Sequence, residues 1–294
     1  LAVAALLGRR RWAFAALALV VVAYLGLAGG GRVAQLAGRP ADWQVAGCEV
    51  GQGDAFLVRS AGRVALIDTG REPAPLKACL DDLGIGRIDL LVLTHYDLDH
   101  VGGVDAVVGR VDLALVGPSS GVDDERIAAD LAAGGARVQQ VARGPSGLLG
   151  ELRWNVLWPP ERLTGIEPGN DASVTLAFEG VGACIDGCLR SIFLGDLGES
   201  AQDRLIAAGP VPVVDVVKVG HHGSADQSPR LYERLGAVVG AIGVGADNGY
   251  GHPTERLLQI LADAGTTPAR TDEDGLILLA PGTEEGTVRV WTQR

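Results

Sequence analysis

The segment His95-Tyr96-Asp97-Leu98-Asp99-His100 places two imidazoles and two carboxylates close together, a density that is typical of metal sites. An apolar run, Leu90 to Leu93, precedes it and predicts a strand buried on both faces. Because the side chains diverge from a tight turn, His95 and Asp97 can bind one cation while Asp99 and His100 bind a second. The alternative is a solvated acidic turn, but the chain has 5 histidines and two of them lie here. The segment therefore predicts metal ligands at the end of a strand.

Further ligands follow two other apolar runs. Asp196 comes after the predicted strand Ser191 to Leu194, and His221 and His222 come after Val213 to Val219. A two-metal centre needs a carboxylate that bridges the ions and an imidazole for the second ion. We expect Asp196 and His221 to fill these roles, because His221 directly follows the strand. His222 is then left to contact substrate or to donate a proton.

These segments resemble the metallo-β-lactamase superfamily, in the variant of its His-x-His-x-Asp-His motif that has Asp at the second ligand position. That variant is found in competence proteins of the ComEC type. The resemblance covers roughly residues 43 to 290, and its blocks occur in the order of that family. The blocks are Val50 to Ala55, Leu66 to Gly70, Asn170 to Ser173, Phe193 to Asp196, Lys218 to Ser224, Asn248 to Pro253 and Arg270 to Asp272.

The resemblance implies an α/β fold, the αββα metallo-β-lactamase-like sandwich, as the C-terminal domain of a competence protein. It also implies a nuclease that cleaves single-stranded DNA during uptake with two divalent metal ions, manganese or zinc. Asp99 and Asp196 would orient the attacking water, and His222, His252 or Lys218 would assist the leaving oxygen. The residues expected to bind substrate are Asn170, Ser173, Gly223, Ser224 and His252.

One departure from the superfamily pattern bears on the choice of metal. No histidine lies between His100 and His221, where hydrolases of this fold usually supply one. The coordination sphere of the ion held by His95 and Asp97 would then be completed by Asp196, water or substrate. A carboxylate at position 97 is a harder ligand than imidazole, so we expect a preference for manganese or magnesium over zinc.

Two candidate residues keep alternative interpretations. Lys218 lies three positions before His221 and is either a phosphate contact or an ordinary lysine at a strand edge. His252 stands in a Gly-rich loop, Asn248 to Pro253, that gives no sign of core burial, which favours substrate binding or protonation of a leaving group.

The N-terminal region predicts a membrane segment. Residues 1–11 form a basic flank ending in Arg9 to Arg11, residues 12–28 are an uncharged apolar run, and residues 29–42 read as a Gly-rich linker to a domain at 43–294. The apolar run is near the lower limit of roughly 17 to 25 residues for a spanning helix, and a signal-peptide core is the alternative. Either way, the arginines before the run place the downstream domain outside the cytoplasm. A separate channel subunit would then be a partner.

Charge and cysteine content limit the possible functions. The net charge of -11 argues against broad binding of nucleic acid through phosphates, so any such contact must be local. Cys184 and Cys188 flank a turn at the tip of a predicted hairpin, where an exported chain permits a disulfide; the alternative is two free thiols. Cys48 and Cys79 lie in a distant strand and helix, so a zinc-binding cysteine set is not expected.

Periodicity predicts alternating strands and helices. Helical spacing appears at 76–83, 101–108 and 123–133. The expected strands are 45–50, 55–58, 64–68, 88–93, 111–116, 137–141, 152–158, 173–178, 191–194 and 213–219.

Two functions compete with a DNA nuclease. The first is a small-molecule hydrolase on the same fold, such as a phosphodiesterase, a phosphorylcholine esterase or a lactonase, which the acidic net charge favours. The second is a non-catalytic domain that binds no metal tightly, a possibility raised by the missing histidine.

Overall fold

The computed structural model describes residues 14, 17–22, 24, 26, 38–284 and 286–294. The chain divides into two units, Leu1–Ala41 and Asp42–Arg294. The basic flank expected at 1–11, about half of the membrane segment expected at 12–28 and most of the linker lie outside the described residues. Among the residues that are described, no helix has the length and apolar character needed to cross a bilayer.

The unit Asp42–Arg294 contains two mixed β-sheets, and each has a parallel stretch. Within the described residues the first sheet has the order β15-β14-β1-β2-β3-β4-β5-β6, with β3 to β6 parallel. Its strands are β1 (Val45–Gly47), β2 (Phe56–Ser60), β3 (Arg63–Ile67), β4 (Ile88–Leu93), β5 (Val111–Val116), β6 (Arg137–Gln140), β14 (Ile277–Pro281) and β15 (Val288–Thr292).

The second sheet has the order β13-β12-β11-β10-β9-β8-β7, again for the described part of the chain. In it β10 to β13 are parallel, whereas β7, β8, β9 and β10 pair antiparallel in sequence. Its strands are β7 (Ser146–Leu149), β8 (Leu152–Trp158), β9 (Thr175–Gly180), β10 (Ser191–Phe193), β11 (Val216–Lys218), β12 (Val239–Ile242) and β13 (Thr267–Arg270).

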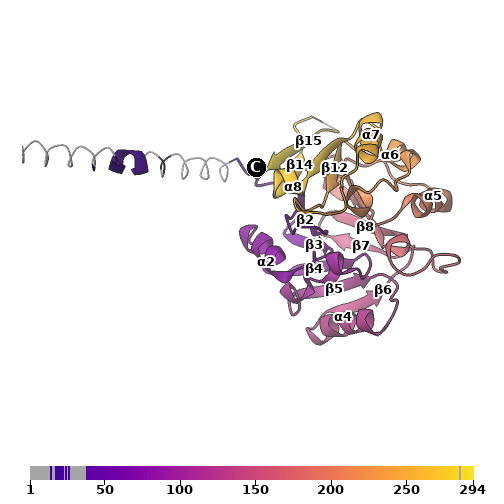
Figure 1. The fold of residues 1–294 in the computed structure, drawn as a ribbon. Helices are drawn as coiled ribbons and strands as arrows, with labels where there is room; N and C mark the ends of the chain where they lie inside the picture. Colours follow the sequence, from indigo (N-terminus) through magenta and orange to yellow (C-terminus); the bar gives the residue numbers. More distant parts are fainter. Residues whose placement is uncertain (1–13, 15–16, 23, 25, 27–37, 285) are drawn as a thin grey trace, which may run out of the picture. The chain divides into compact units, whose positions relative to one another are not determined.

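Helices cover the outer face of each sheet, which gives the αββα sandwich expected from the sequence (Figure 1). Leu76 of α2 and Leu131 of α4 belong to an apolar cluster with the outer side chains of β2, β3 and β4. Leu205 of α5, Leu231 of α6 and Leu257 of α7 form a similar cluster with β10, β11 and β12. The helices are α2 (Pro73–Asp82), α3 (Leu98–Val101), α4 (Val122–Ala133), α5 (Glu199–Ala208), α6 (Pro229–Leu235), α7 (Glu255–Asp263) and α8 (Thr271–Asp274).

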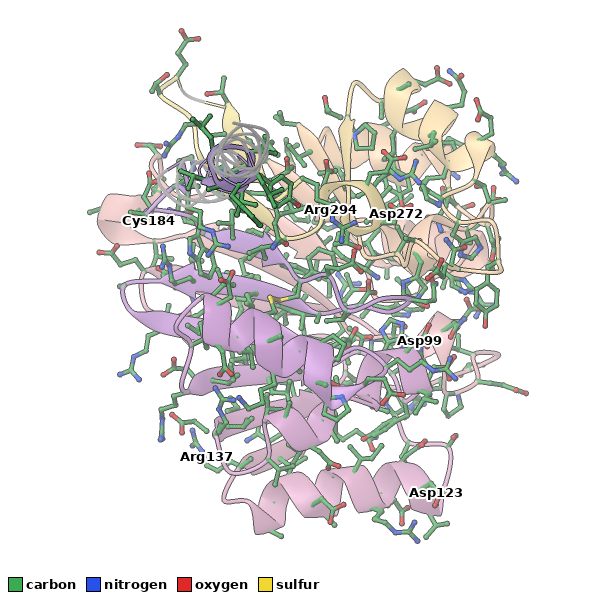
Figure 2. The ribbon with its side chains drawn as sticks, turned by 60° about the vertical axis from the view of Figure 1, so that its left-hand side comes forward. Asp99, Asp123, Arg137, Cys184, Asp272 and Arg294 are labelled. Carbon is green, nitrogen blue, oxygen red and sulfur yellow. A yellow bond between two sulfur atoms is a disulfide. The ribbon has the colours of Figure 1, made fainter. Side chains whose placement is uncertain are left out.

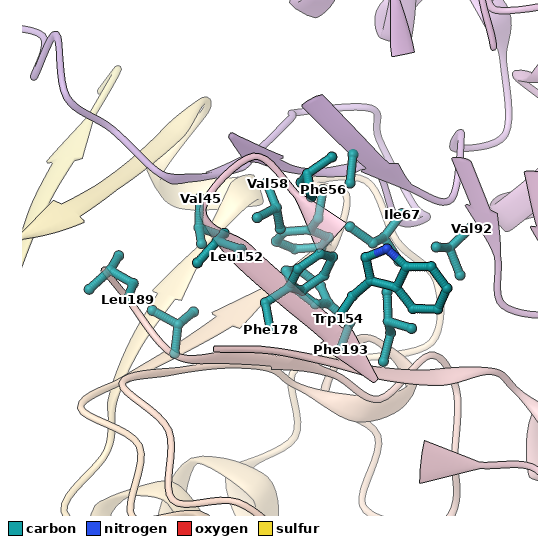
Figure 3. Packing of buried hydrophobic residues seen from close by; sticks show 14 of the residues in the cluster. Val45, Phe56, Val58, Ile67, Val92, Leu152, Trp154, Phe178, Leu189 and Phe193 are labelled. Atoms are coloured by element: carbon teal, nitrogen blue, oxygen red, sulfur yellow. The ribbon is translucent and has the colours of Figure 1, made fainter. Parts of the chain in front are cut away.

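The core lies between the two sheets, where side chains of alternate strand residues meet (Figure 3). Phe56 and Ile67 of the first sheet face Phe178 and Phe193 of the second, and Trp154 closes the same layer. The rings of Phe178 and Phe193 meet edge to face with centroids 5.8 Å apart, an arrangement that aromatic pairs prefer. This apolar layer fixes the two sheets, and with them the loops at their edges.

The single helix expected at 101–108 does not form. This part of the chain instead contains the single turn α3, which ends at Val101, and a separate 3-10 turn at Val104–Ala106. Gly102 and Gly103 separate the two turns. A Cβ on Gly102 would lie 2.1 Å from the carbonyl oxygen of Arg71, and a Cβ on Gly103 would lie 2.1 Å from that of Thr69. The chain therefore passes so close to the loop after β3 that only glycine fits, and the turn changes direction there.

Two disulfides close segments of the domain. Cys184 and Cys188 are bonded at the tip of the β9–β10 hairpin, which confirms the pairing considered from the sequence. Cys48, after β1, is bonded to Cys79 in α2, a pairing that the sequence did not suggest. The second bond ties the segment that follows β1 to the helix layer.

Candidate metal centre

The polar residues gather at one edge of the sandwich because parallel strands end there. In the first sheet β3 leads to Asp68 and the parallel strand β4 leads to the His95 segment. In the second sheet β10 leads to Asp196 and the parallel strand β11 leads to His222. The carboxyl ends of parallel strands meet at the same edge of a sheet, so four separate chain segments bring these side chains together.

Four ligand atoms surround a common point. The Nε2 atom of His222 lies 3.2 Å from Oδ2 of Asp99, 3.3 Å from Oδ2 of Asp196 and 3.3 Å from Nε2 of His100. The Nε2 atom of His100 lies 3.2 Å from the same Oδ2 of Asp196. A tetrahedral ion with ligands at about 2.0–2.1 Å requires ligand atoms roughly 3.3–3.4 Å apart. These separations therefore match the edges of a coordination polyhedron.

In His100 and His222 the Nδ1 atom is hydrogen-bonded, which leaves the Nε2 atom available to bind a metal ion. The Nδ1 atom of His100 lies 2.8 Å from Oδ2 of Asp68, and Nδ1 of His222 lies 2.8 Å from the carbonyl oxygen of Gly243. Each acceptor requires a proton on Nδ1, so Nε2 carries the lone pair in the neutral ring. Metal-binding histidines are oriented by acceptors of this kind.

His95 has the same arrangement on the other side of the cluster. The hydroxyl of Thr94 donates to Oδ2 of Asp68, so its oxygen is an acceptor for Nδ1 of His95 at 3.1 Å. The Oγ atom of Ser173 lies 3.3 Å from the same Nδ1. The Nε2 atom of His95 is buried and has no hydrogen-bond partner, and it lies 3.6 Å from Oδ2 of Asp97. An orphaned buried acceptor is costly, and a cation beside it would remove that cost.

The charges of the site call for more than one cation. Asp54, Asp68 and Asp196 are buried with His100 and His222, and Asp97 and Asp99 stand at the open side. The Lys218 ammonium is 1% exposed and forms ion pairs with Asp54 and Asp196. One lysine and two divalent ions would together balance these five carboxylates. The donor set and the charge thus both fit a two-metal centre.

The pKa values reflect the same crowding. Burial lowers the pKa of His100, but the carboxylates of Asp196 and Asp68 outweigh it and raise that pKa to about 10. Burial raises the pKa of Asp99, yet the hydrogen bond from His222 and the charge of His100 bring it down to about 2. The carboxylates thus favour positive charge on the imidazoles, and bound metal ions would take the place of the protons.

The His221–His222 turn has an unusual backbone. Both residues have positive φ angles, 48° and 51°, a conformation that non-glycine residues rarely adopt. The side chain of Gln227 holds the turn by donating to the carbonyl oxygen of Gly220 at 3.0 Å, and it accepts a hydrogen bond from Tyr232 at 2.7 Å. The strain turns His222 inward and leaves His221 at the surface of the site, which is consistent with a functional constraint.

The structure reverses the positions expected for these two histidines. His222, expected to face the substrate, is buried among the ligand atoms. His221, expected to be the ligand, has a side chain that is 34% exposed, with Nε2 3.9 Å from Oδ2 of Asp196. The sequence offered no means of choosing between adjacent histidines, because the choice depends on the backbone angles of the turn.

Several residues expected to touch substrate are instead part of the framework. Lys218 lies beneath the carboxylates, away from the open side. Ser173 is buried, and its Oγ accepts a hydrogen bond from the backbone N–H of Asp196 at 3.1 Å. Ser224 is buried and accepts hydrogen bonds from Gln227 and from the backbone of residue 226. In this structure these side chains are hydrogen-bonded or ion-paired within the protein and support the candidate ligands.

The remaining candidates lie at the entrance or next to it. His252 is half-buried and its ring meets that of His221 edge to face at 5.8 Å. Asn170 is half-buried in the 3-10 turn before Ser173. A Cβ on Gly223 would clash with Pro253 at 2.6 Å, so this glycine allows the His252 loop to approach the site. Asp54 and Asp68 are buried beside the cluster, and in the sequence they stand within the blocks Val50 to Ala55 and Leu66 to Gly70 of the family resemblance.

Comparison with known proteins agrees with this geometry. The family model described as the metallo-beta-lactamase superfamily matches residues 48–238. The chain is 29% identical over 269 residues to ComE operon protein 3 of Bacillus subtilis (strain 168), covering 83% of this chain and 34% of that protein. It is also 29% identical over 248 residues to Competence protein ComA of Neisseria gonorrhoeae, covering 80% of this chain and 32% of that protein. The chain thus spans about a third of the length of these relatives.

Two solved structures share the fold. CmlA, a diiron beta-hydroxylase from Streptomyces venezuelae, has a TM-score of 0.53 at 17% identity, over 82% of this chain and 55% of that one. The metallo-beta-lactamase fold protein YhfI from Bacillus subtilis has a TM-score of 0.50 at 11% identity, over 77% of this chain and 95% of that one. With its two sheets, its histidine and aspartate cluster and its match to the family model, the chain belongs to the metallo-beta-lactamase superfamily.

Proposed function

We propose that this domain is a metal-dependent phosphodiesterase that cleaves single-stranded DNA. The observation that carries the proposal is the convergence of His100 and His222, through their Nε2 atoms, with Asp99 and Asp196 at an open edge, beside the ring of His95 whose centroid lies 4.1 Å from that of His100. Divalent ions held by these residues would supply Lewis acidity toward a phosphoryl oxygen and acidify water. His95 and Asp97 would hold one ion, and Asp99, His100 and His222 the other, with Asp196 between them.

The protein side chains would divide the remaining work by their position. Asp99 has a 26% exposed side chain and lies at the entrance, where it can accept a hydrogen bond from an attacking water. His221 and His252 are at the outer side of the cluster, where their N–H groups can hydrogen-bond to phosphate oxygens or to the leaving oxygen. Lys218 is a positioning residue, because it contacts the carboxylates and not the open side.

The DNA substrate is supported by the two competence proteins, although the chain covers about a third of each. A small phosphodiester is the second candidate, and the net charge of -11 favours it because a DNA backbone would be repelled. A domain without catalysis is the third. The buried, mutually oriented ligand atoms argue against it, since an acidic cluster of this kind is costly to keep without a cation.

We also propose that the domain acts outside the cytoplasm, attached to a membrane, beside the channel of a DNA-uptake system. Two disulfides support an oxidising compartment. The arginines at 9–11 before an apolar run support the direction of the topology. A reporter fused after Arg294 tests it: one that works only outside the cytoplasm should be active, and a fusion that works only in the cytosol would contradict the topology.

The activity can be tested with three substrates and three metals. The purified chain is stripped of metal, reloaded with manganese, magnesium or zinc, and given single-stranded DNA, duplex DNA and methyl p-nitrophenyl phosphate. We expect metal-dependent cleavage of the single strand. Hydrolysis of the small diester with none of DNA would select the second candidate, and the absence of both hydrolysis and bound metal would select the third. Asp196→Asn serves as the control, since it keeps the shape of the side chain and removes its charge.

A further inference from the structure

The loop after β12 carries an exposed aromatic ring next to the candidate metal centre. Tyr250 is 71% exposed, and its ring stacks on that of His252 with centroids 5.8 Å apart and an interplanar angle of 26°. His252 in turn meets His221 edge to face at 5.8 Å, and Nε2 of His221 lies 3.9 Å from Asp196. The three rings form a continuous row that runs from the ligands to solvent. One face of Tyr250 rests on this row, and the ring is open to solvent beyond it.

The loop that carries the ring is held in one conformation. The side chain of Asn248 donates to the carbonyl oxygens of Gly245 at 2.8 Å and His252 at 3.0 Å, and accepts from the N–H of His252 at 3.0 Å. The N–H of Thr254 donates to the carbonyl oxygen of Gly223 at 2.9 Å, which joins the loop to the His221 turn. Tyr250 is therefore presented in a fixed place, and little conformational entropy is lost when a flat group binds to it.

The charge of the chain restricts how a DNA strand can be bound here. The net charge is -11, and Arg256 at the start of the following helix α7 already forms an ion pair with Glu199 at 3.1 Å. Phosphate contacts along a groove cannot then supply most of the affinity. Stacking of a base on an aromatic ring contributes about 1–3 kcal/mol per base and does not depend on protein charge.

We propose that Tyr250 is a stacking platform for the base of a nucleotide next to the scissile phosphate. This inference rests on the proposed function and adds the means of substrate selection. Every base has a flat face, so the platform accepts any sequence but requires a base. In duplex DNA the bases are stacked on one another inside the helix, so the platform favours single strands.

The test uses oligonucleotides with one abasic position moved along the strand. For the unaltered chain we expect kcat/KM to fall about 5- to 150-fold when the abasic position is next to the cleavage site, which corresponds to the stacking energy of one base. Tyr250→Ala should show the same fall on intact DNA and no further loss on the abasic strand. Tyr250→Phe keeps the ring and should behave as the unaltered chain does.

A control variant separates stacking from general surface changes. Leu148, 63% exposed on the edge strand β7, is replaced by alanine and should keep the full abasic penalty. An abasic penalty in Tyr250→Ala as large as in the unaltered chain would overturn the stacking site, even though DNA is cleaved. A chain that hydrolyses methyl p-nitrophenyl phosphate and no DNA would overturn the proposed function itself, and the stacking site with it.

Discussion

The two ends of the sandwich are stabilised in different ways. Figure 2 shows Asp99 and Cys184 on opposite sides of the domain. At the Asp99 end the buried groups are charged, and Asp54, Lys218 and Asp196 meet there within a cluster of imidazoles. At the Cys184 end a short hairpin is closed by a disulfide. The comparison shows that the buried groups of one end are charged and offer ligands for metal ions, whereas the other end is closed by a covalent bond.

The largest expected effect is at the charged end. Asp196→Ala and Asp99→Ala each remove a carboxylate that faces the histidine nitrogens at 3.2 to 3.3 Å. We expect hydrolysis to fall below a few per cent in each variant, while circular dichroism stays close to that of the unaltered protein because no core side chain is removed. If both variants keep more activity than this, the two-metal mechanism is wrong.

Lys218→Met should affect stability through the charges that it leaves unbalanced. Removal of the ammonium leaves Asp54 buried without its ion-pair partner, and such losses cost about 3–5 kcal/mol. Denaturant unfolding measures the loss. The double variant Lys218→Met/Asp54→Asn removes the stranded charge and should recover a large part of the stability. Equal losses in the single and double variants would show that the ion pair is not the cause.

The disulfide at the other end, Cys184–Cys188, should contribute less to stability than Cys48–Cys79. Chain-entropy arguments give about 3.7 kcal/mol for Cys48–Cys79 and about 2 kcal/mol for Cys184–Cys188, because their sequence separations are 31 and 4. Paired alanine variants, unfolded in denaturant, would measure both values. We expect the Cys184–Cys188 variant to keep its activity, since this hairpin is remote from Asp99. Loss of activity in that folded variant would contradict the division between the two ends.

The smallest expected effect is a change of metal preference at the charged end. Asp97 has a side chain that is 60% exposed and lies 3.6 Å from Nε2 of His95. Asp97→His replaces a hard oxygen ligand by nitrogen, so the ratio of manganese-dependent to zinc-dependent turnover should fall. Turnover and bound metal are measured for manganese, magnesium and zinc in both proteins. An unaltered chain that already works best with zinc, or a ratio that does not change, would mean that Asp97 does not bind the metal.

Local patterns in the sequence determined much of the fold. The strands β4 and β8 were predicted with the bounds that the structure shows, Ile88–Leu93 and Leu152–Trp158. Both are continuous or alternating apolar runs, which specify burial whatever their neighbours are. After residue 219 only the loop Asn248 to Pro253 was predicted, although the helical spacing of Leu257, Ile260 and Leu261 in α7 and the apolar run of β14 were there to be found. The candidate ligands at His95 to His100 were proposed from a local pattern too, since four ligand-type side chains stand in one short segment.

Contacts between distant segments were decided only by the tertiary structure. The pairing of Asp54 with Lys218 joins the loop before β2 to the end of β11, and no local pattern indicates it. The same holds for Cys48 and Cys79, which meet only when α2 packs on the first sheet. The inward turn of His222 depends on backbone angles that Gln227 and the loop after β12 impose from outside. Residue types and their spacing therefore determined which chemistry the chain can perform, whereas the pairing of its strands decided which atom of which residue is in place to perform it.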